Sequence, residues 1–369
     1  MNFTLDNLGN TCYFNTAIQC MFSSDNFVRS LYNAKSDDLL VKLFKKLIHK
    51  IVTDRKNESL HKDLKNVIMY MNHEIKFMEL FEQNDLCEFT ICWFDLLHKA
   101  TKIEYDENKH STHDIIQRVT RSMNSNMIKL SELCEKQMKK EYNKSKYSFV
   151  CKELNSMIIS QIKCGCGKLW TNYELHNHLQ LDIHNKVDIY ESIEEYVNSI
   201  YFNDPSEENT TEWTCDACKR KQKSKRNVAF WNLANTFVIF LKRFSIVADG
   251  SHANGFRFVK DNTNIEIPTL LDMSPYVINA RYTNNKFKLI SVGCHIGRMN
   301  GGHYYSVLRD NDQTNNDKGN TYDNKDTIDF SKPQQWRVVD DESSVSIKEG
   351  SDRFRMCMKN AYMLVYSKI

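Results

Sequence analysis

The residues best suited to chemistry are a cysteine near the start of the chain and a histidine near its end. Cys12 stands where an apolar stripe with helical spacing begins, and His303 follows a pair of glycines and precedes an apolar stretch. A thiol and an imidazole that meet in a fold are the minimum requirement for catalysis by a cysteine nucleophile. A helix start favours the reactive thiolate, because free backbone N–H groups and the helix dipole stabilise negative charge there.

A histidine base also needs a partner that fixes its tautomer. The run Asp340-Asp341-Glu342 supplies carboxylates, although such a run by itself is typical of a solvated acidic turn. Gly302 would leave room for a substrate backbone beside His303. His295 fits the preceding strand better than the catalytic position. Most free cysteines are small buried hydrophobes, and we expect this of Cys20, Cys87, Cys92, Cys134, Cys151, Cys294 and Cys357.

Four further cysteines form two close pairs. Cys215 and Cys218 have the C-x-x-C spacing of a tetrahedral zinc site, whereas Cys164 and Cys166 form a tighter C-x-C pair. We expect all four to hold a structural zinc ion with no open position for catalysis. The alternative is four reduced thiols in a zinc-free tip, and a disulfide is the least favoured outcome in a reducing compartment.

Composition limits the classes of partner. The 369 residues carry a formal net charge of +3, which is too balanced to indicate nucleic acid. The basic run at 219–226 beside the second cysteine pair therefore reads as a solvated face, and we do not expect a nucleic-acid partner. No apolar run approaches the roughly 20 residues of a membrane span, and we expect no signal peptide. We expect a cytoplasmic or nuclear location.

The apolar pattern changes along the chain and so predicts the elements that position these residues. Apolar side chains recur at helical spacing from residue 10 to about 152, for example Phe14, Ala17, Ile18, Met21 and Phe22. After about residue 154 the pattern favours strands, with one more helix at 189–200. Strands are predicted at 229–231, 237–244, 287–292, 304–308, 336–339 and 362–366, and a long polar loop at 310–332.

Several of these segments together resemble the ubiquitin-specific proteases, the papain-like cysteine deubiquitinases. Residues 8–22 resemble the family's cysteine box, 287–307 its histidine box, 336–345 its W-x-x-F-D-D-x-x-V segment and 360–366 its closing strand. Val339 replaces the usual aromatic residue of the third segment. The resemblance extends from about Leu5 to Tyr366, which left us expecting no additional targeting domain.

The resemblance implies a role for each matching residue. Cys12 would be the nucleophile, His303 the base and Asp340 the residue that orients it, while Asn7 would donate to the oxyanion and Asp341 would support that site. Asp85, in a segment that resembles the family's Q-x-D-A-x-E-F helix start, would contact the substrate's C-terminal tail, or simply cap a helix. The family often binds a structural zinc through two C-x-x-C pairs, which here correspond to Cys164, Cys166, Cys215 and Cys218.

The resemblance also implies the architecture and the activity. We expect an α+β, papain-like cysteine protease with a helical thumb at about 1–152, β-rich fingers at 153–230 and an antiparallel β palm at 231–369, all in one catalytic domain at 1–369. The function implied is a deubiquitinating isopeptidase that cleaves after ubiquitin's C-terminal glycine through a thioester. The alternatives are a protease for another ubiquitin-like modifier and an inactive ubiquitin-binding module. The partners would be ubiquitin and its conjugates, and the protein a monomer.

Overall fold

The computed structural model describes residues 3–53, 60–75, 82–106, 125–198, 200–204, 211–248, 255–279, 284–298, 301–310 and 334–369. The predicted polar loop at 310–332 lies outside these residues, apart from Asp310. Among the described residues no helix combines the length and apolar character needed to cross a membrane.

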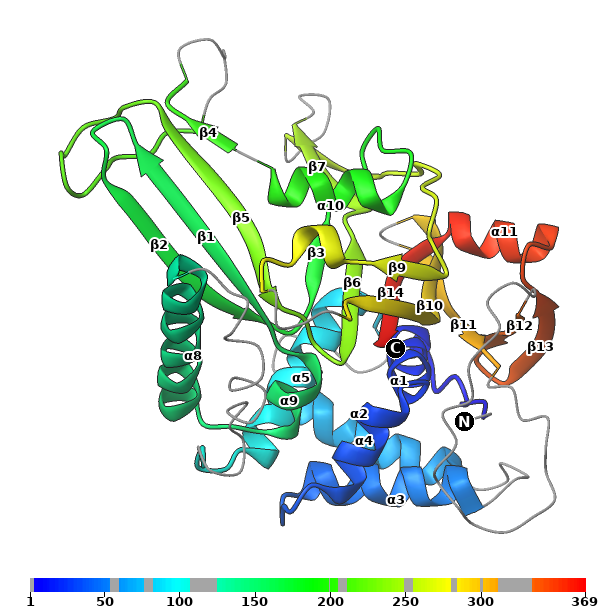
Figure 1. Ribbon diagram of the computed structural model, residues 1–369. Helices are drawn as coiled ribbons and strands as arrows, with labels where there is room; N and C mark the ends of the chain where they lie inside the picture. The colour runs from blue at the N-terminus through cyan, green and yellow to red at the C-terminus, as the bar shows by residue number, and fades with distance from the viewer. Residues whose placement is uncertain are drawn as a thin grey trace.

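A group of helices precedes the first strand, as the helical spacing predicts. They are α1 (Cys12–Phe22), α2 (Asp25–Asn33), α3 (Leu39–Thr53), α4 (Leu60–Glu74), α5 (Leu86–Thr101), α8 (Ser125–Ser145) and α9 (Phe149–Leu154). Capping side chains set several helix starts, since Ser24, Asp85 and Ser148 each accept a bond from a backbone N–H in the first turn. We call α1–α5 and α9 the thumb. They gather at the bottom of Figure 1, with α8 beside the first strands.

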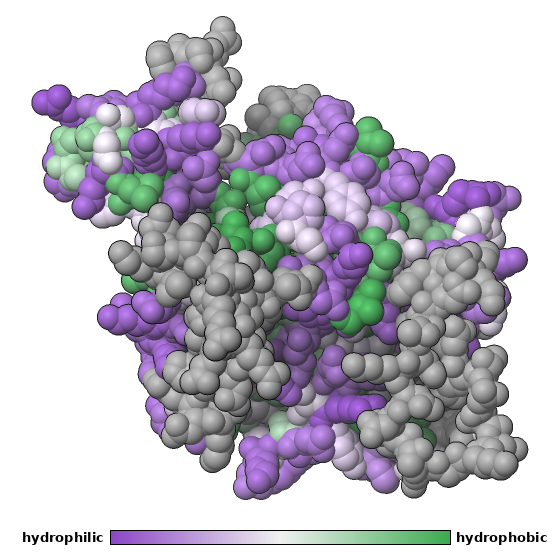
Figure 2. Space-filling model, viewed as in Figure 1, coloured by the Kyte–Doolittle hydropathy of each residue, from purple (hydrophilic) through white to green (hydrophobic). Residues whose placement is uncertain are grey.

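Four strands form the sheet that we call the finger sheet, in the order β2-β1-β5-β4. Their bounds are β1 (Ser156–Cys164), β2 (Leu169–His176), β4 (Ile200–Phe202) and β5 (Ser224–Asn232), and all of their pairings are antiparallel. The sheet extends away from the body (Figure 1) and stands out as a lobe on a largely hydrophilic surface (Figure 2). Because β1 ends at Cys164 and β5 begins at Ser224, the cysteine pairs lie at the tip of this lobe.

A larger sheet, which we call the palm sheet, has the order β13-β12-β11-β10-β14-β6-β3, with β9 also paired to β10. The strand bounds are β3 (Leu179–Leu181), β6 (Thr236–Leu241), β9 (Leu270–Asp272), β10 (Lys286–Arg298), β11 (Gly301–Arg309), β12 (Gln335–Asp340), β13 (Ser343–Lys348) and β14 (Ala361–Lys368). Two helices and a 3-10 turn accompany it: α10 (Ile189–Val197), α11 (Asp352–Lys359) and η1 (Ser274–Tyr276). A separate hairpin pairs β7 (Phe244–Ala248) with β8 (Phe256–Lys260).

The α+β prediction is confirmed, whereas the thumb, finger and palm ranges stay predictions, with one segment that the strand pairing places differently. The segment 179–181 falls within the range predicted for the fingers, but it forms β3, which runs parallel to β6 in the palm sheet. The thumb and palm share one hydrophobic core, because Val238, Phe240, Met363 and Val365 of the palm belong to the same buried cluster as the thumb helices. Burial of this common core holds the thumb against the palm.

Candidate active site

Cys12 is the first residue of α1 and is buried, with 4% of its surface exposed. The N-cap residue, Thr11, makes no side-chain bond to the first turn. Its hydroxyl instead accepts a bond from the N–H of Leu8 at 3.0 Å. The first-turn N–H groups of a helix have no intrahelical partner, so they remain available to a negative charge that develops beside Cys12.

His303 and Asp340 are brought together by the register of the palm sheet. His303 lies near the start of β11, and Asp340 is the last residue of β12, the strand next to β11. The two side chains meet at 2.5 Å, from Nε2 of His303 to Oδ1 of Asp340. With Nε2 held by the carboxylate, Nδ1 is the ring nitrogen left to serve Cys12, whose thiol is close enough to shift the pKa of His303.

This environment favours the imidazolium form of His303. The interaction with Cys12 is the largest cause of the shift in the His303 pKa, and the hydrogen bond with Asp340 is the next cause that favours the charged ring. Together they outweigh the effect of burial and raise the pKa of His303 from 6.5 to about 9. His295 behaves in the opposite way, because burial and the nearby cations lower its pKa to about 4. His295 lies in β10, as expected, and is 2% exposed. The neutral ring of His295 is therefore a packing group beside the charged one.

Asn7, Asp341 and Asn15 form a network of hydrogen bonds in front of α1. Asn7 donates from Nδ2 to Oδ2 of Asp341 at 2.7 Å, and Asn15 donates from Nδ2 to Oδ1 of the same carboxylate at 2.8 Å. Oδ1 of Asn7 accepts from the backbone N–H groups of Gly9 and Thr11. A primary amide has two N–H donors, so Asp341 holds one of those on Asn7 and fixes the direction of the other.

Cys12 opens onto a pocket of about 270 Å³ between the thumb and the palm. Asp85 lines it, but both of its oxygens are occupied: Oδ1 caps α5 and Oδ2 accepts from the hydroxyls of Tyr304 and Tyr362. The capping role that the sequence allowed is thus present. Glu88 lines the same pocket from an exposed position on α5, and its carboxylate bonds to no other side chain of the described residues. Glu88 is better placed than Asp85 to meet a cationic substrate.

Gly302 serves the packing of the palm sheet. A Cβ atom at this position would come within 2.1 Å of Nε2 of His295 and 2.7 Å of the carbonyl oxygen of Ile296. The space above Gly302 is therefore taken up by the neighbouring strand. This differs from the expectation that the missing side chain would make room for the substrate.

The four predicted zinc ligands meet at the finger tip. The sulfurs of Cys164, Cys166, Cys215 and Cys218 all lie within 4.8 Å of one another. The Sγ atoms of Cys164 and Cys218 are 3.9 Å apart, as are those of Cys166 and Cys215. Zinc–sulfur bonds of about 2.3 Å in a tetrahedron place sulfurs about 3.8 Å apart, so the cluster fits a zinc ion despite the short C-x-C spacing.

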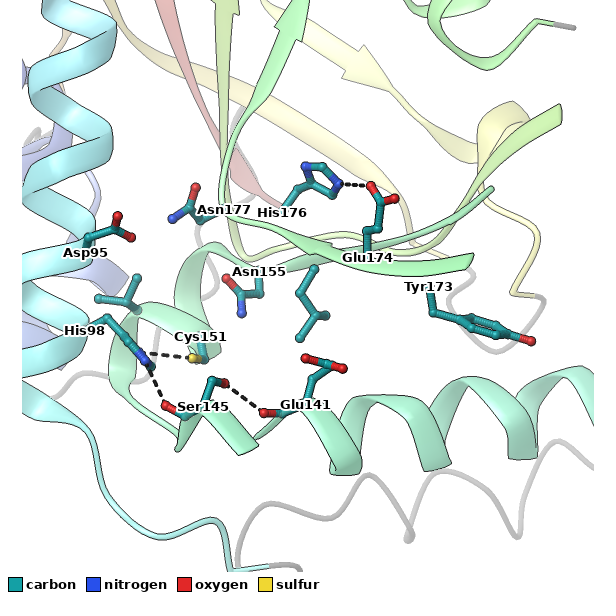
Figure 3. A pocket seen from close by; sticks show the side chains of 12 residues that line it. Asp95, His98, Glu141, Ser145, Cys151, Asn155, Tyr173, Glu174, His176 and Asn177 are labelled. Carbon is teal, nitrogen blue, oxygen red and sulfur yellow. Dashed lines mark hydrogen bonds and ion pairs between the residues drawn. The ribbon is translucent and has the colours of Figure 1, made fainter. Parts of the chain in front are cut away.

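A larger pocket of about 530 Å³ lies away from Cys12, between α5, α8, α9 and β2. It contains a second cysteine–histidine pair, Cys151 and His98, whose Sγ and Nδ1 atoms are 3.6 Å apart (Figure 3). Here the other ring nitrogen contacts the carbonyl of Ser145 instead of a carboxylate, and burial raises the pKa of the Cys151 thiol. These features disfavour a thiolate–imidazolium pair, so we do not assign catalysis to this pocket.

Sequence reasoning missed three residues around the active site: Asn15, Glu88 and Gln83. Asn15 was visible as a polar residue within the apolar first helix, and its side chain is indeed buried against Asp341. Glu88 was visible three residues after Asp85, the spacing that places both at the start of α5. Gln83 gave no separate signal, because its partner Gly302 is distant in the sequence.

Comparison with known proteins identifies the family of this chain. A family model described as ubiquitin carboxyl-terminal hydrolase matches residues 3–366. "Ubiquitin carboxyl-terminal hydrolase 4" of Vanderwaltozyma polyspora is 24% identical over 419 residues, covering 100% of this chain and 41% of the relative. The protein of the same name from Saccharomyces cerevisiae is 22% identical, covering 99% of this chain and 39% of the relative. This chain thus spans about two fifths of the length of these curated relatives.

Solved structures show the same fold. A chain of the SAGA Ubp8/Sgf11/Sus1/Sgf73 DUB module bound to ubiquitin aldehyde superposes with a TM-score of 0.68 at 19% identity, covering 99% of this chain and 69% of that one. A related module bound to monoubiquitin gives a TM-score of 0.67 at 18% identity, with the same coverage of both chains. These two likenesses concern the fold alone. On the match of the family model to nearly its whole length, this chain belongs to the ubiquitin carboxyl-terminal hydrolase family.

Proposed function

We propose that this chain is a deubiquitinating cysteine isopeptidase that cleaves the bond after ubiquitin's C-terminal glycine. The observation that carries the proposal is the grouping of three side chains: Cys12 lines the pocket between thumb and palm and raises the pKa of His303, and His303 is hydrogen-bonded to Asp340. The name of the family and the ubiquitin bound to the related modules support ubiquitin as the modifier.

The geometry supports a mechanism in two half-reactions. Sγ of Cys12 attacks the carbonyl carbon of the terminal glycine, and the oxyanion that forms accepts bonds from Nδ2 of Asn7 and from the first turn of α1. His303 gives its proton to the departing lysine amine, which leaves a thioester on Cys12. His303 then takes a proton from water, which attacks the thioester and releases ubiquitin with a free carboxylate. Asp340 keeps the ring oriented throughout.

Asp341 acts in this proposal through Asn7. A carboxylate accepts hydrogen bonds and so cannot itself donate to an oxyanion. The two carboxylate oxygens of Asp341 accept hydrogen bonds from Asn7 and Asn15, so Asp341 is a positioning residue for the oxyanion site. The zinc ion, when bound at the finger tip, would link the β1–β2 turn to the segment before β5 and stabilise the sheet.

The surface beside the pocket suits a protein substrate. Phe244 lines the pocket at the start of β7, and the β7–β8 hairpin that follows exposes Ile246, Phe256 and Phe258 by 63%, 60% and 52%. Exposed apolar groups gathered on one hairpin are typical of a docking surface. We therefore place the folded part of ubiquitin against this hairpin. A monomeric state and a cytoplasmic or nuclear location remain predictions.

A ubiquitin probe with a C-terminal electrophile tests the proposal. The expected result is a covalent adduct at Cys12 in the wild type and none in Cys12→Ala, with matching turnover of a fluorogenic ubiquitin substrate. Cys151→Ala is the control and should label normally. Labelling by a probe built on another modifier, with none by ubiquitin, would support the alternative protease. Absence of labelling with retained ubiquitin binding would indicate the inactive module.

A further inference from the structure

Within the part of the chain that the structure describes, no strand pairs with the outer edge of β11 next to the candidate catalytic histidine. β12 pairs with β11 only from Ser306 to Arg309, whereas β11 continues back to Gly301. In an antiparallel strand the N–H and C=O of one residue point to the same side. Residues an even number apart direct these groups to the same side of the strand, and Gly302 is four residues before Ser306. The backbone groups of Gly302 therefore face the same side of β11 as those of Ser306, but there they face the pocket instead of β12.

A side chain from the thumb occupies these groups. Gln83 donates from Nε2 to the carbonyl of Gly302 at 2.8 Å and accepts at Oε1 from the N–H of Gly302 at 3.3 Å. One donor and one acceptor on a planar amide reproduce what a peptide group of a neighbouring strand would offer. Gln83 and Gly302 both line the pocket that contains Cys12. The bridge thus spans the pocket from thumb to palm.

We propose that Gln83 is a latch that imitates a peptide group, and that the extended tail of the substrate replaces it on Gly302 as an added strand. The inference rests on the proposed function, since it takes a glycine-terminated tail as the ligand. Such a tail must pass next to His303 to bring its carbonyl to Cys12. Extended peptides commonly bind by adding to a free strand edge through main-chain hydrogen bonds. The tail must break the two Gln83–Gly302 hydrogen bonds before it can form its own two with Gly302. The latch therefore lowers the affinity for the substrate and leaves the chemical step unaffected.

Kinetics of the latch variants with a fluorogenic ubiquitin amide test the proposal. Gln83→Ala removes both bonds, and Gln83→Glu sets a carboxylate against the carbonyl of Gly302. We expect KM to fall about fivefold in each, the effect of two modest exposed hydrogen bonds, with kcat unchanged. Gln137→Ala is the matched control, because it removes an amide that bonds to Glu141 on α8, and its KM should not change. A higher or an unchanged KM in Gln83→Ala would overturn the latch.

Two measurements without substrate separate this inference from the proposed function. Hydrogen exchange at the Gly302 amide should be faster in Gln83→Ala than in the wild type, and so should alkylation of Cys12 by chloroacetamide. If the exchange rates are equal, the bridge does not exist in solution and the proposal is wrong. If no form of the protein turns over ubiquitin, the proposed function fails, and these two rates alone decide whether Gln83 closes the pocket.

Discussion

Replacing Asp340 with asparagine should separate the contribution of its charge from that of its shape. Asparagine has nearly the volume of aspartate and keeps an oxygen that can accept from Nε2 of His303. It removes the negative charge that lies 2.5 Å from that ring. The imidazolium form of His303 should therefore lose stability relative to the neutral ring, and the pKa of His303 should fall.

The size of the effect follows from the pKa of His303. A rise from 6.5 to about 9 corresponds to about 3 kcal/mol in favour of the imidazolium. Cys12 accounts for the larger part, and the His303 side chain is 33% exposed, so solvent screening weakens the rest. We assign about 1–2 kcal/mol to Asp340, which predicts a loss of about 5- to 30-fold in kcat/KM.

The pH profile of kcat/KM shows in which direction the charge of Asp340 shifts the pKa of His303. A raised pKa means that the charged ring stabilises the fold fully below pH 6.5 and stops doing so as the pH rises through about 9. If activity needs the imidazolium, the alkaline limb of kcat/KM should lie near pH 9 in the wild type and about one pH unit lower in Asp340→Asn.

The assay is turnover of a fluorogenic ubiquitin amide from pH 6 to about 10, together with the rate of Cys12 alkylation. Asp352→Asn provides the control, because it removes an exposed carboxylate that binds Arg355 on α11, and neither residue lines the pocket. An alkaline limb at the same pH in Asp340→Asn and wild type would refute the assignment of Asp340 as the group that holds the charged ring.

Four other changes test separate parts of the site. Gly302→Ala should lower the melting temperature by crowding His295, at a cost of about 1–3 kcal/mol by calorimetry. Asn7→Ala should lower kcat about 10²- to 10³-fold with little change in KM, as expected for loss of an oxyanion donor in steady-state assays. Chelator treatment should lower the melting temperature of the wild type and leave Cys218→Ser unaffected, with metal content measured in parallel. Glu88→Gln should raise KM for ubiquitin and leave kcat unchanged if Glu88 binds a cationic tail.

Local pattern in a short segment pointed to Cys12 and His303 as candidate catalytic residues, whereas Asp340 was assigned from the resemblance of 336–345 to a family segment. Cys12 begins a helical stripe, and His303 and Asp340 lie at a strand start and a strand end. The structure places them on α1, β11 and β12, and His303 and Asp340 each lie one residue outside the strands predicted at 304–308 and 336–339. The cysteine pairs were visible for the same reason, since metal ligands are close in sequence. Each pair lies within one turn, and the meeting of the two turns at the finger tip follows from the β1–β5 pairing.

The residues that sequence reasoning missed depend on contacts between distant segments. Gln83 and Gly302 are 219 positions apart, and Asn15 and Asp341 are 326 apart. No local periodicity encodes such a contact, because it exists only after the thumb has packed on the palm. The same holds for β3, whose short run could join either sheet until tertiary packing aligned it with β6. Local pattern and resemblance thus pointed to candidate reacting groups, whereas the network that positions them required the fold.

The helix–sheet contact inside the shared core determines how these reacting groups are held. Ser291 donates to the carbonyl of Cys20 at 2.9 Å and Ser306 to Oε1 of Gln19 at 2.7 Å, so buried bonds attach α1 to β10 and β11. At Gly293 a Cβ atom would come within 3.1 Å of Cγ2 of Thr16, which leaves no gap between the helix and the sheet. The nucleophile and its base are therefore aligned by core packing before any substrate binds. The latch proposed for Gln83 therefore concerns access to the pocket and not this alignment, because Gln83 is exposed and lies outside the packed core.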